Sequence, residues 1–234
     1  MNYFYTITSS NYYWITEKSI KSFLKNCDSK EIYHIYCVDN IENKLIDSRI
    51  IYKDISEVMN KVGYSIEKLG ISSYCMFSKS VFDLIEKKSI YEKIIFADSD
   101  ILYFRDIVQY INELDCNTIY TCMNLNKDKK KKYTHPNSLN SGFICIPRKH
   151  ANDFFIKWRM EMERLIIKEN IIKNVDQIAL RNIDGDLKSI RIPLTVLSLK
   201  TRRDNCYACH YYKLRKRNRQ LFEDDYREYI INNK

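Results

Sequence analysis

YEKIIFADSDILYFRD, residues 91–106, contains an apolar strand pattern that is followed directly by two carboxylates. Residues 93–97, KIIFA, have the β-branched and aromatic character of a buried strand, and Asp98 and Asp100 follow at once. Residues two apart in an extended chain point to the same side, so these carboxylates repel each other unless a cation lies between them. Hard oxygen ligands on this narrow spacing suit Mg²⁺ or Mn²⁺. The stretch therefore predicts a strand end that holds a divalent cation.

A D-x-D pattern also has a purely structural explanation, in which Asp98 caps a turn and Asp100 forms a salt bridge. The position after an apolar strand favours the metal site instead. Open α/β sheets bind their ligands beyond the carboxyl ends of the strands, and both aspartates are expected there.

Short strand patterns alternate with longer helical patterns along the whole chain. The expected strands cover residues 3–8, 32–38, 93–97, 118–124, 142–147 and 190–197. The expected helices cover residues 15–26, 73–88, 106–114, 151–170 and 175–183. Asp106 and Gln109 fit a capping box, and Met160, Leu165 and Ile167 are expected to pack in the core. The alternation predicts an α/β fold with a mostly parallel central sheet flanked by helices.

Composition favours one folded domain. The chain has 234 residues, 45% of them hydrophobic, with four Gly and three Pro, which fits a single domain over 1–220 and an accessory tail over 221–234. The sequence contains neither an apolar run long enough to cross a membrane nor a signal-peptide pattern, which predicts a cytoplasmic protein. The eight cysteines are accordingly expected to be reduced thiols, and His34 and His150 to be structural.

Much of the net charge of +9 lies in two basic blocks, KDKKKK at 127–132 and KLRKRNR at 213–219. Such blocks indicate a polyanionic partner, which is nucleic acid, an acidic membrane surface or a phosphorylated small molecule. A solvated loop is the preferred interpretation of the first block. The second block leaves open a peripheral contact with an acidic membrane or a glycolipid acceptor.

Several segments occur in the order found in one enzyme family. FADSDILYFRDI (96–107) resembles the D-x-D segment of the GT-A glycosyltransferases and is closest to their family-8, glycogenin-like group. Other segments similar to that group are ITSSNY (7–12), SSYCMFSKSVFDLI (72–85), LNSGFICIP (139–147) and VDQIALRNI (175–183). Ser9 and Ser10 stand where the group has carboxylates, and HYYKLRKR (210–217) is the nearest match to its C-terminal H-x-x-G-x-x-K-P-W. The resemblance implies a GT-A fold and transfer of a hexose from a nucleoside diphosphate sugar, UDP-linked, to a hydroxyl of a glycan, glycolipid or protein.

The resemblance also implies the metal ligands, which are Asp98, Asp100 and His210 around Mn²⁺ or Mg²⁺. Residues 206–210 also match the C-x-x-C-H motif, through Cys206, Cys209 and His210. Haem attachment through that motif requires an exported protein, and a zinc site requires a second pair of ligands, so the Mn²⁺ interpretation is preferred.

The remaining site residues follow from the same resemblance. Asp176 and Gln177 are expected to be catalytic, with Asp176 on the sugar hydroxyls and Gln177 near the anomeric carbon. Substrate-binding residues are expected to be Thr8, Asn11, Lys79, Ser99, Asn140, Ser141, Gly142 and Lys213. Retention of configuration is implied, but Asp176 is also a candidate base for inversion and a candidate helix cap.

Three other classes stay open. A nucleic-acid-binding protein would use the two basic blocks, but it leaves the acidic pair without a role. A nucleotidyltransferase would also place D-x-D on a metal, yet it needs an early glycine-rich or lysine-rich phosphate loop, and TITSSNYY (6–13) contains no glycine. A non-catalytic relative that only binds sugar nucleotides is the third.

Overall fold

The computed structural model describes residues 1–28, 30–86, 90–123, 139–200, 202–211, 214 and 216–232. Its strands are β1 (Asn2–Thr8), β2 (Tyr33–Cys37), β3 (Ile50–Asp54), β4 (Lys93–Ala97), β5 (Ile101–Tyr103), β6 (Tyr120–Met123), β7 (Leu139–Pro147), β8 (Ile190–Ile192), β9 (Leu197–Leu199) and β10 (Ala208–His210). Its helices are η1 (Ser10–Tyr12), α1 (Tyr13–Asn26), α2 (Ser56–Lys61), α3 (Ile66–Leu69), α4 (Ile71–Ser78), α5 (Phe82–Ile85), α6 (Ile107–Glu113), α7 (Arg148–Glu169), α8 (Val175–Leu187), α9 (Lys216–Asp225) and η3 (Tyr226–Asn232). The basic block 127–132 and Lys213 lie outside the described residues.

A seven-stranded sheet forms the centre of the molecule in the order β3-β2-β1-β4-β7-β6-β8. Its described neighbours pair in parallel except that β7 is antiparallel to both β4 and β6. Strands β1 and β4 are buried along their whole length, as their continuous apolar and aromatic sequences require. A smaller sheet, β5-β10-β9, stands beside it. The predicted α/β fold with a mostly parallel sheet is confirmed.

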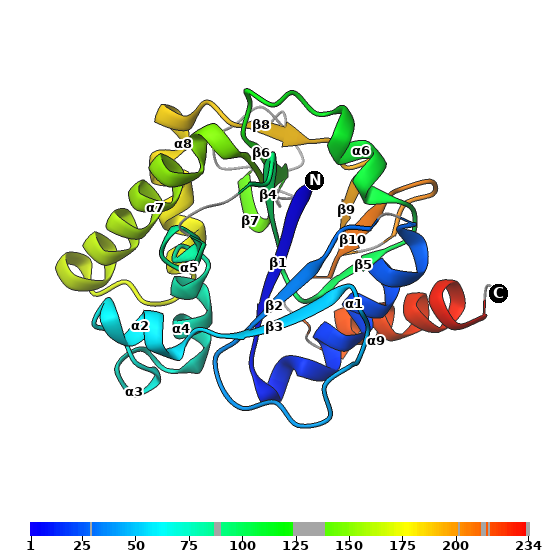
Figure 1. The fold of residues 1–234 in the computed structure, drawn as a ribbon, viewed down its shortest axis with the longest axis horizontal. Coiled ribbons are helices and arrows are strands. Elements are labelled where there is room, and N and C mark those ends of the chain that lie inside the picture. Colours follow the sequence, from blue (N-terminus) through cyan, green and yellow to red (C-terminus); the bar gives the residue numbers. More distant parts are fainter. Residues whose placement is uncertain are drawn as a thin grey trace.

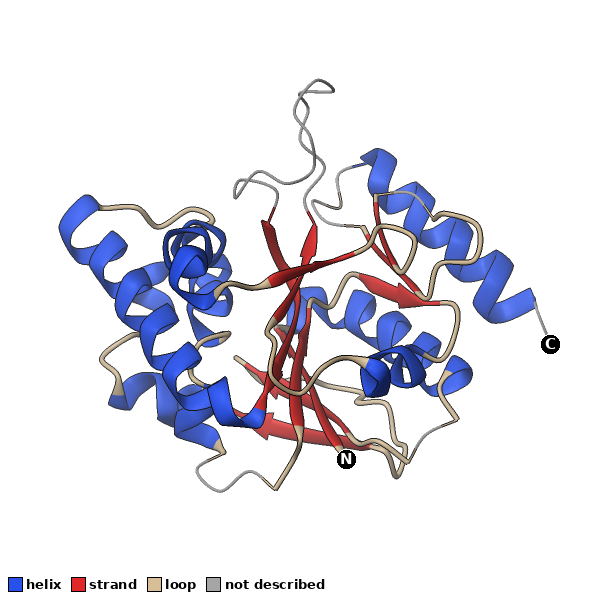
Figure 2. Cartoon of the chain, turned by 90° about the horizontal axis from the view of Figure 1, so that it is seen from above, coloured by secondary structure: helices blue, strands red, loops and turns tan. Residues whose placement is uncertain are grey.

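Helices cover both faces of the central sheet (Figures 1 and 2). One face packs against α7, α8 and the short helices α4 and α5, and its core includes the buried Trp158 and Phe155. The other face packs against α1 and α6 around Phe4 and Phe23. The carboxyl ends of β1 and β4 remain accessible between these layers, so the fold leaves space for a ligand there.

The C-terminal segment packs onto the domain as well. The expected boundary after residue 220 falls inside α9, whose Phe222 is 0% exposed. Tyr226 and Ile230 join Phe222 in a third core cluster with Ile15 of α1. Residues 216–232 therefore support α1 and the small sheet.

Two expected elements are divided in the structure. The helix expected over 73–88 ends at Ser78, because the carbonyl oxygens of Lys79 and Ser80 accept hydrogen bonds from Tyr5 Oη and Arg159 Nη1, both 2.9 Å. The strand expected over 190–197 is two strands in different sheets. A turn at Pro193 separates them, in which the carbonyl of Pro193 accepts from the backbone N–H groups of residues 196 and 197.

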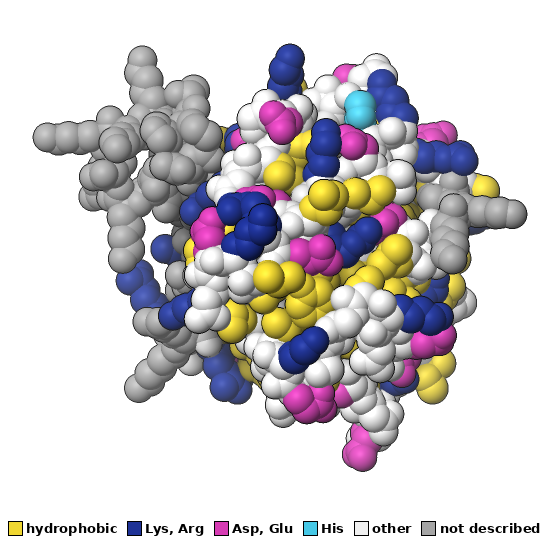
Figure 3. All heavy atoms as spheres, turned by 90° about the vertical axis from the view of Figure 1, so that its left-hand side faces the viewer, with side chains coloured by type: hydrophobic (Ala, Val, Ile, Leu, Met, Phe, Trp, Pro, Cys, Tyr) yellow, Lys and Arg dark blue, Asp and Glu magenta, His cyan; other side chains and the backbone are white. Residues whose placement is uncertain are grey.

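The outer face of α7 corrects one further expectation. Leu165 is buried, but Met160 and Ile167 are 61% and 74% exposed and do not pack in the core. Figure 3 shows the side of the molecule on which α7 and α2 lie, where acidic and basic side chains are interspersed and no field of one sign forms. Within the described residues, none of the helices is both long enough and apolar enough to cross a membrane.

Candidate functional site

Asp98 and Asp100 lie at the end of β4, as expected, and two distant segments fix their backbone. The N–H of Asp98 donates to the carbonyl of Gly142 at 2.7 Å, and the carbonyl of Asp100 accepts from the N–H of Tyr211 at 3.0 Å. The second contact continues the antiparallel ladder of β5 and β10, in which Ile101 lies opposite His210. This ladder brings His210 to the acidic pair across 110 residues of sequence.

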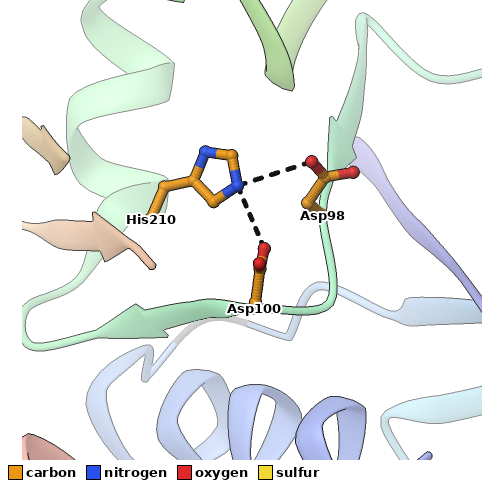
Figure 4. Close-up of side chains that lie close together, drawn as sticks. All are labelled: Asp98, Asp100 and His210. Carbon is orange, nitrogen blue, oxygen red and sulfur yellow. Dashed lines mark ion pairs between the residues drawn. The ribbon is translucent and has the colours of Figure 1, made fainter. Parts of the chain in front are cut away.

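The three side chains converge on one point. Nε2 of His210 lies 3.0 Å from Oδ1 of Asp100 and 3.4 Å from Oδ2 of Asp98 (Figure 4). One ligand atom from each residue lies within 4.8 Å of the others. Adjacent ligands of an octahedral cation with bonds near 2.1 Å are separated by about 3.0 Å, so the observed spacing fits Mg²⁺ or Mn²⁺. Two carboxylates and one imidazole also form a donor set that suits Mn²⁺.

Lys79 holds Asp98 and Asp176 together on the other side of the site. Its Nζ lies 2.8 Å from Oδ1 of Asp98 and 2.7 Å from Oδ2 of Asp176. Lys79 is the C-cap residue of α4 and keeps a helical backbone conformation. The residue is 8% exposed, so the ammonium is a buried charge with two paired carboxylates.

The electrostatics of the cluster reflect burial and mutual contact. Burial alone lowers the pKa of Lys79, but the charges of Asp176 and Asp98 outweigh it and leave that pKa above its ordinary value. Burial lowers the pKa of His210 too, but Asp100 together with the other neighbouring groups raises it by more, so the net direction of the pKa shift is upward. Burial raises the pKa of Asp98 although Lys79 and His210 act against the shift.

Strand β7 supplies an irregular segment to the site. Thr121 of β6 pairs with Ile144, but the next residue, Cys122, pairs with Asn140, so residues 141–143 form a bulge. Bulges re-aim side chains and are frequent beside active sites. On its other side β7 stays in register with β4, so the bond from the N–H of Asp98 to the carbonyl of residue 142 continues the β4–β7 ladder, in which Ala97 lies opposite Phe143.

Within the bulge, Ser141 connects to the start of α8. Its Oγ donates to Oδ2 of Asp176 at 2.8 Å, and its N–H donates to Oε1 of Gln177 at 3.0 Å. Asp176 lies in the first turn of α8, whose N-cap is Asn174, so its carboxylate serves these contacts and does not cap the helix. The expected catalytic residues and the expected N-S-G strand are thus one hydrogen-bonded unit.

The position of the His210 ring requires a glycine at residue 142. A Cβ at this position would lie 2.0 Å from Cε1 and 2.5 Å from Nδ1 of the imidazole. The N–H of Gly142 donates to Oδ1 of Asn140 at 2.7 Å, which fixes the close approach. The absence of a side chain at residue 142 therefore creates the space in which His210 lies.

A cavity of about 210 Å³ opens beside the acidic pair. Its wall contains Thr8, Ser99 and Lys79 of the expected residues, together with Asp98 and Asp100. The sequence did not indicate the other residues of the wall, which are Ile7, Ser9, Tyr12, Ile71, Ser72, Cys75, Met76 and Phe96. Most of these are apolar residues of ordinary core character, so no chemical pattern marked them.

One expected residue stands apart from this cavity, and another lies outside the described residues. Asn11 lies on η1 with an exposed side chain and is not part of the cavity wall. Its neighbour Ser10 instead binds Asp39, through its N–H at 2.7 Å and its hydroxyl at 2.8 Å. Lys213 lies outside the described residues.

Comparison with solved structures defines the fold class, whereas comparison of sequences does not. No family model matches the chain, and no curated protein matches it in sequence. The arrangement of its elements is that of the GT-A glycosyltransferases, and the chain has the GT-A fold.

Three solved structures illustrate the similarity. The galactosyltransferase LgtC, in complex with donor and acceptor sugar analogues, has a TM-score of 0.61 at 14% identity, and the alignment covers 96% of each chain. Mouse xyloside xylosyltransferase 1 has a TM-score of 0.56 at 14% identity, with 98% of this chain and 94% of that one covered. The glycosyltransferase GlyE of Streptococcus pneumoniae TIGR4 has a TM-score of 0.61 at 14% identity, with 96% and 59% covered.

Proposed function

We propose that the protein is a metal-dependent glycosyltransferase that moves a hexose from a nucleoside diphosphate sugar, UDP-linked, to an acceptor hydroxyl. The observation that carries the proposal is the convergence of Asp98, Asp100 and His210 beside a cavity at the carboxyl edge of the sheet. The GT-A fold and the glycosyltransferases that share it support this class. Assignment to the family-8 group remains part of the proposal.

We assign the cation to Asp98, Asp100 and His210, whose donor atoms support this choice. When bound there, Mn²⁺ or Mg²⁺ neutralises the charge that grows on the diphosphate leaving group. Lys79 holds the carboxylate of Asp98 from the side opposite His210 and adds a positive charge next to the cavity. Thr8 and Ser99, on the cavity wall, are assigned to the nucleoside.

Asp176 and Gln177 are assigned to the transferred sugar. The buried carboxylate of Asp176 already accepts from Lys79 and Ser141, which favours a positioning role over that of a general base. This arrangement supports retention of configuration. Gln177 lies next to the same hydroxyl, and an active-site glutamine-to-glutamate mutant is known for the similar protein LgtC.

The decisive experiment presents the protein with a panel of UDP- and GDP-sugars in the presence of Mn²⁺. We expect one donor to raise the midpoint of thermal unfolding and to release the nucleoside diphosphate. EDTA and Asp100→Asn should abolish both effects. The control is Asp186→Asn on the exposed surface of α8, which should behave like the wild type.

The alternatives give different results in the same experiment. Binding of DNA or RNA that weakens steeply with salt, with no response to any donor, would support a nucleic-acid-binding protein. Stabilisation by a donor without product would support a non-catalytic relative. Proton NMR of the anomeric position of the product distinguishes retention from inversion.

A further inference from the structure

Two adjacent residues of α7 bind the two segments that meet at the buried ion pair of the site. Nε1 of Trp158 donates to the backbone carbonyl of Asp176 at 2.9 Å. Nη1 of Arg159 donates at 2.9 Å to the backbone carbonyl of Ser80, the residue directly after Lys79. The side chains of Lys79 and Asp176, which are 97 residues apart in the sequence, are in contact at 2.7 Å. One helix is therefore bonded to the backbone on each side of that contact.

The start of α8 depends on contacts from outside the helix. Its N-cap residue, Asn174, has a positive φ of 54° and makes no side-chain cap hydrogen bond. Without such a cap the first turn of a helix is less stable, and here that turn carries Asp176 and Gln177. The carbonyl of Asp176 uses one lone pair for the helical bond, so the second lone pair is able to accept from the indole. The bond from Trp158 therefore fixes the turn without interrupting the helix.

The second segment is the connection between α4 and α5. Arg159 forms a two-point ion pair with Asp83 of α5, at 2.7 and 3.0 Å, and both side chains are largely buried. A planar guanidinium held at two points has a fixed direction. Its further bond to the carbonyl of Ser80 therefore sets the position of the backbone beside Lys79.

Helix α7 is a suitable support for both contacts. It is 22 residues long, packs against α8 and α5 (Figure 1), and buries Trp158 completely. A buried indole N–H requires an acceptor, and any carbonyl within reach would satisfy it. The acceptor in this structure belongs to Asp176, whose side chain is assigned to the transferred sugar.

We propose that Trp158 and Arg159 are positioning residues of the sugar site. Together they fix the separation of the backbones that carry Asp176 and Lys79. A displacement of about 1 Å caused by a substitution far from the reacting atoms can lower an enzymatic rate about 100-fold. The inference rests on the proposed function, because it requires a donor sugar at Asp176.

The first test uses NMR on the full chain, which contains two tryptophans, Trp14 and Trp158. Trp14→Phe assigns their indole N–H resonances. Spectra are recorded in diamagnetic Mg²⁺, with UDP and then with the UDP-sugar that stabilises the wild type. We expect the UDP-sugar to shift the Trp158 resonance relative to UDP, because the sugar contacts the residue whose carbonyl accepts from the indole. The same Trp158 resonance with both compounds would overturn the inference.

The second test measures turnover of that UDP-sugar by the variants. Trp158→Phe keeps a buried ring and removes the N–H. Arg159→Lys keeps a charge for Asp83 but lacks the fork that also reaches Ser80. Each variant should lower kcat by about tenfold or more while its affinities for UDP and Mn²⁺ stay within about twofold of wild type. Phe23→Leu, at a buried ring on the opposite face of the sheet, should lower the unfolding midpoint and leave kcat unchanged.

The outcomes separate this inference from the proposed function. A folded Trp158→Phe variant with wild-type kcat would overturn the inference and leave the proposed function standing. If Trp158→Phe fails to fold, the wild-type resonance and the kcat of Arg159→Lys decide. A wild-type chain that responds to no donor would overturn the proposed function and the inference with it.

Discussion

Adding one methyl group at Gly142 tests the geometry of the site most directly. In Gly142→Ala the new Cβ would lie 2.0 Å from Cε1 of His210, whereas ordinary contact begins at 3.4 Å. The separation must therefore grow by 1.4 Å. The backbone of residue 142 is held on both sides, by Oδ1 of Asn140 and by the N–H of Asp98, so the ring is the part that moves. Residue 142 has no positive φ, so the clash and not backbone strain sets the cost.

The expected effects are separable into stability and binding. Overpacking of a close-packed interior costs about 1–3 kcal/mol, and we expect a loss in this range in the presence of EDTA. The 3.0 Å contact between Nε2 of His210 and Asp100 does not survive a shift of 1.4 Å. With one ligand displaced, Mn²⁺ affinity should fall by at least about 10–100-fold, which is the loss caused by removing only a hydrogen-bond partner of a ligand. Urea unfolding in EDTA and calorimetric titration with Mn²⁺ measure the two effects.

Gly185→Ala is the control, because a Cβ at Gly185 of α8 would meet nothing within 4 Å beyond its chain neighbours and the backbone of its own helix. Replacing a helical glycine by alanine should raise stability by up to about 1 kcal/mol and leave Mn²⁺ affinity unchanged. A second control removes the clash: in a His210→Ala background, Gly142→Ala should cost much less than in the wild type. The reasoning fails if Gly142→Ala binds Mn²⁺ within twofold of wild type, or if its cost is the same in both backgrounds.

Three further perturbations follow from the packing. Lys79→Met leaves the buried carboxylate of Asp176 and the half-buried one of Asp98 without their ammonium partner, and it should destabilise the metal-free protein by about 3–5 kcal/mol in urea unfolding. Lys61→Met at an exposed pair should change nothing measurable. Burial, aided by Lys53, lowers the pKa of His34 from 6.5 to about 3. Below pH 6.5 the unfolded chain binds a proton that the folded chain excludes, so stability should fall with pH toward 3 by at most about 1.4 kcal/mol per unit, and His34→Phe should flatten the profile. Phe222→Ala should cost about 3–5 kcal/mol, and an unchanged unfolding midpoint would show that the C-terminal segment is accessory.

The regular parts of the fold were predictable because their sequence patterns agree with their burial. The continuous apolar runs of β1 and β4 match strands buried on both faces, and the 3.6-residue periodicity of α7 and α8 matches helices packed on one side. Strand β3, with a partly exposed pattern, and the three-residue strands of the small sheet gave no such signal. Their positions depend on pairing between segments far apart in the sequence.

The residues of the candidate site also differ in whether a local sequence pattern predicts them. Asp98 and Asp100 were predictable from local pattern, because two acids at the end of an apolar strand are unusual. His210 was predicted only through resemblance to a family, since nothing local to residues 206–210 indicates pairing with β5.

The features that the sequence did not predict are those that build the site. Helix α4 ends at Ser78, just before Lys79, the β6–β7 register shifts beside Gly142, and the short β5–β10 ladder brings His210 to Asp100. The first two interrupt regular secondary structure, and the third pairs segments that lie far apart in the sequence. Local propensity selects regular elements, so a site that requires irregular ones must be stabilised by tertiary contacts that no local window contains. Substitutions that restore regularity, such as alanine at residue 142, should therefore damage the site more than they damage the fold.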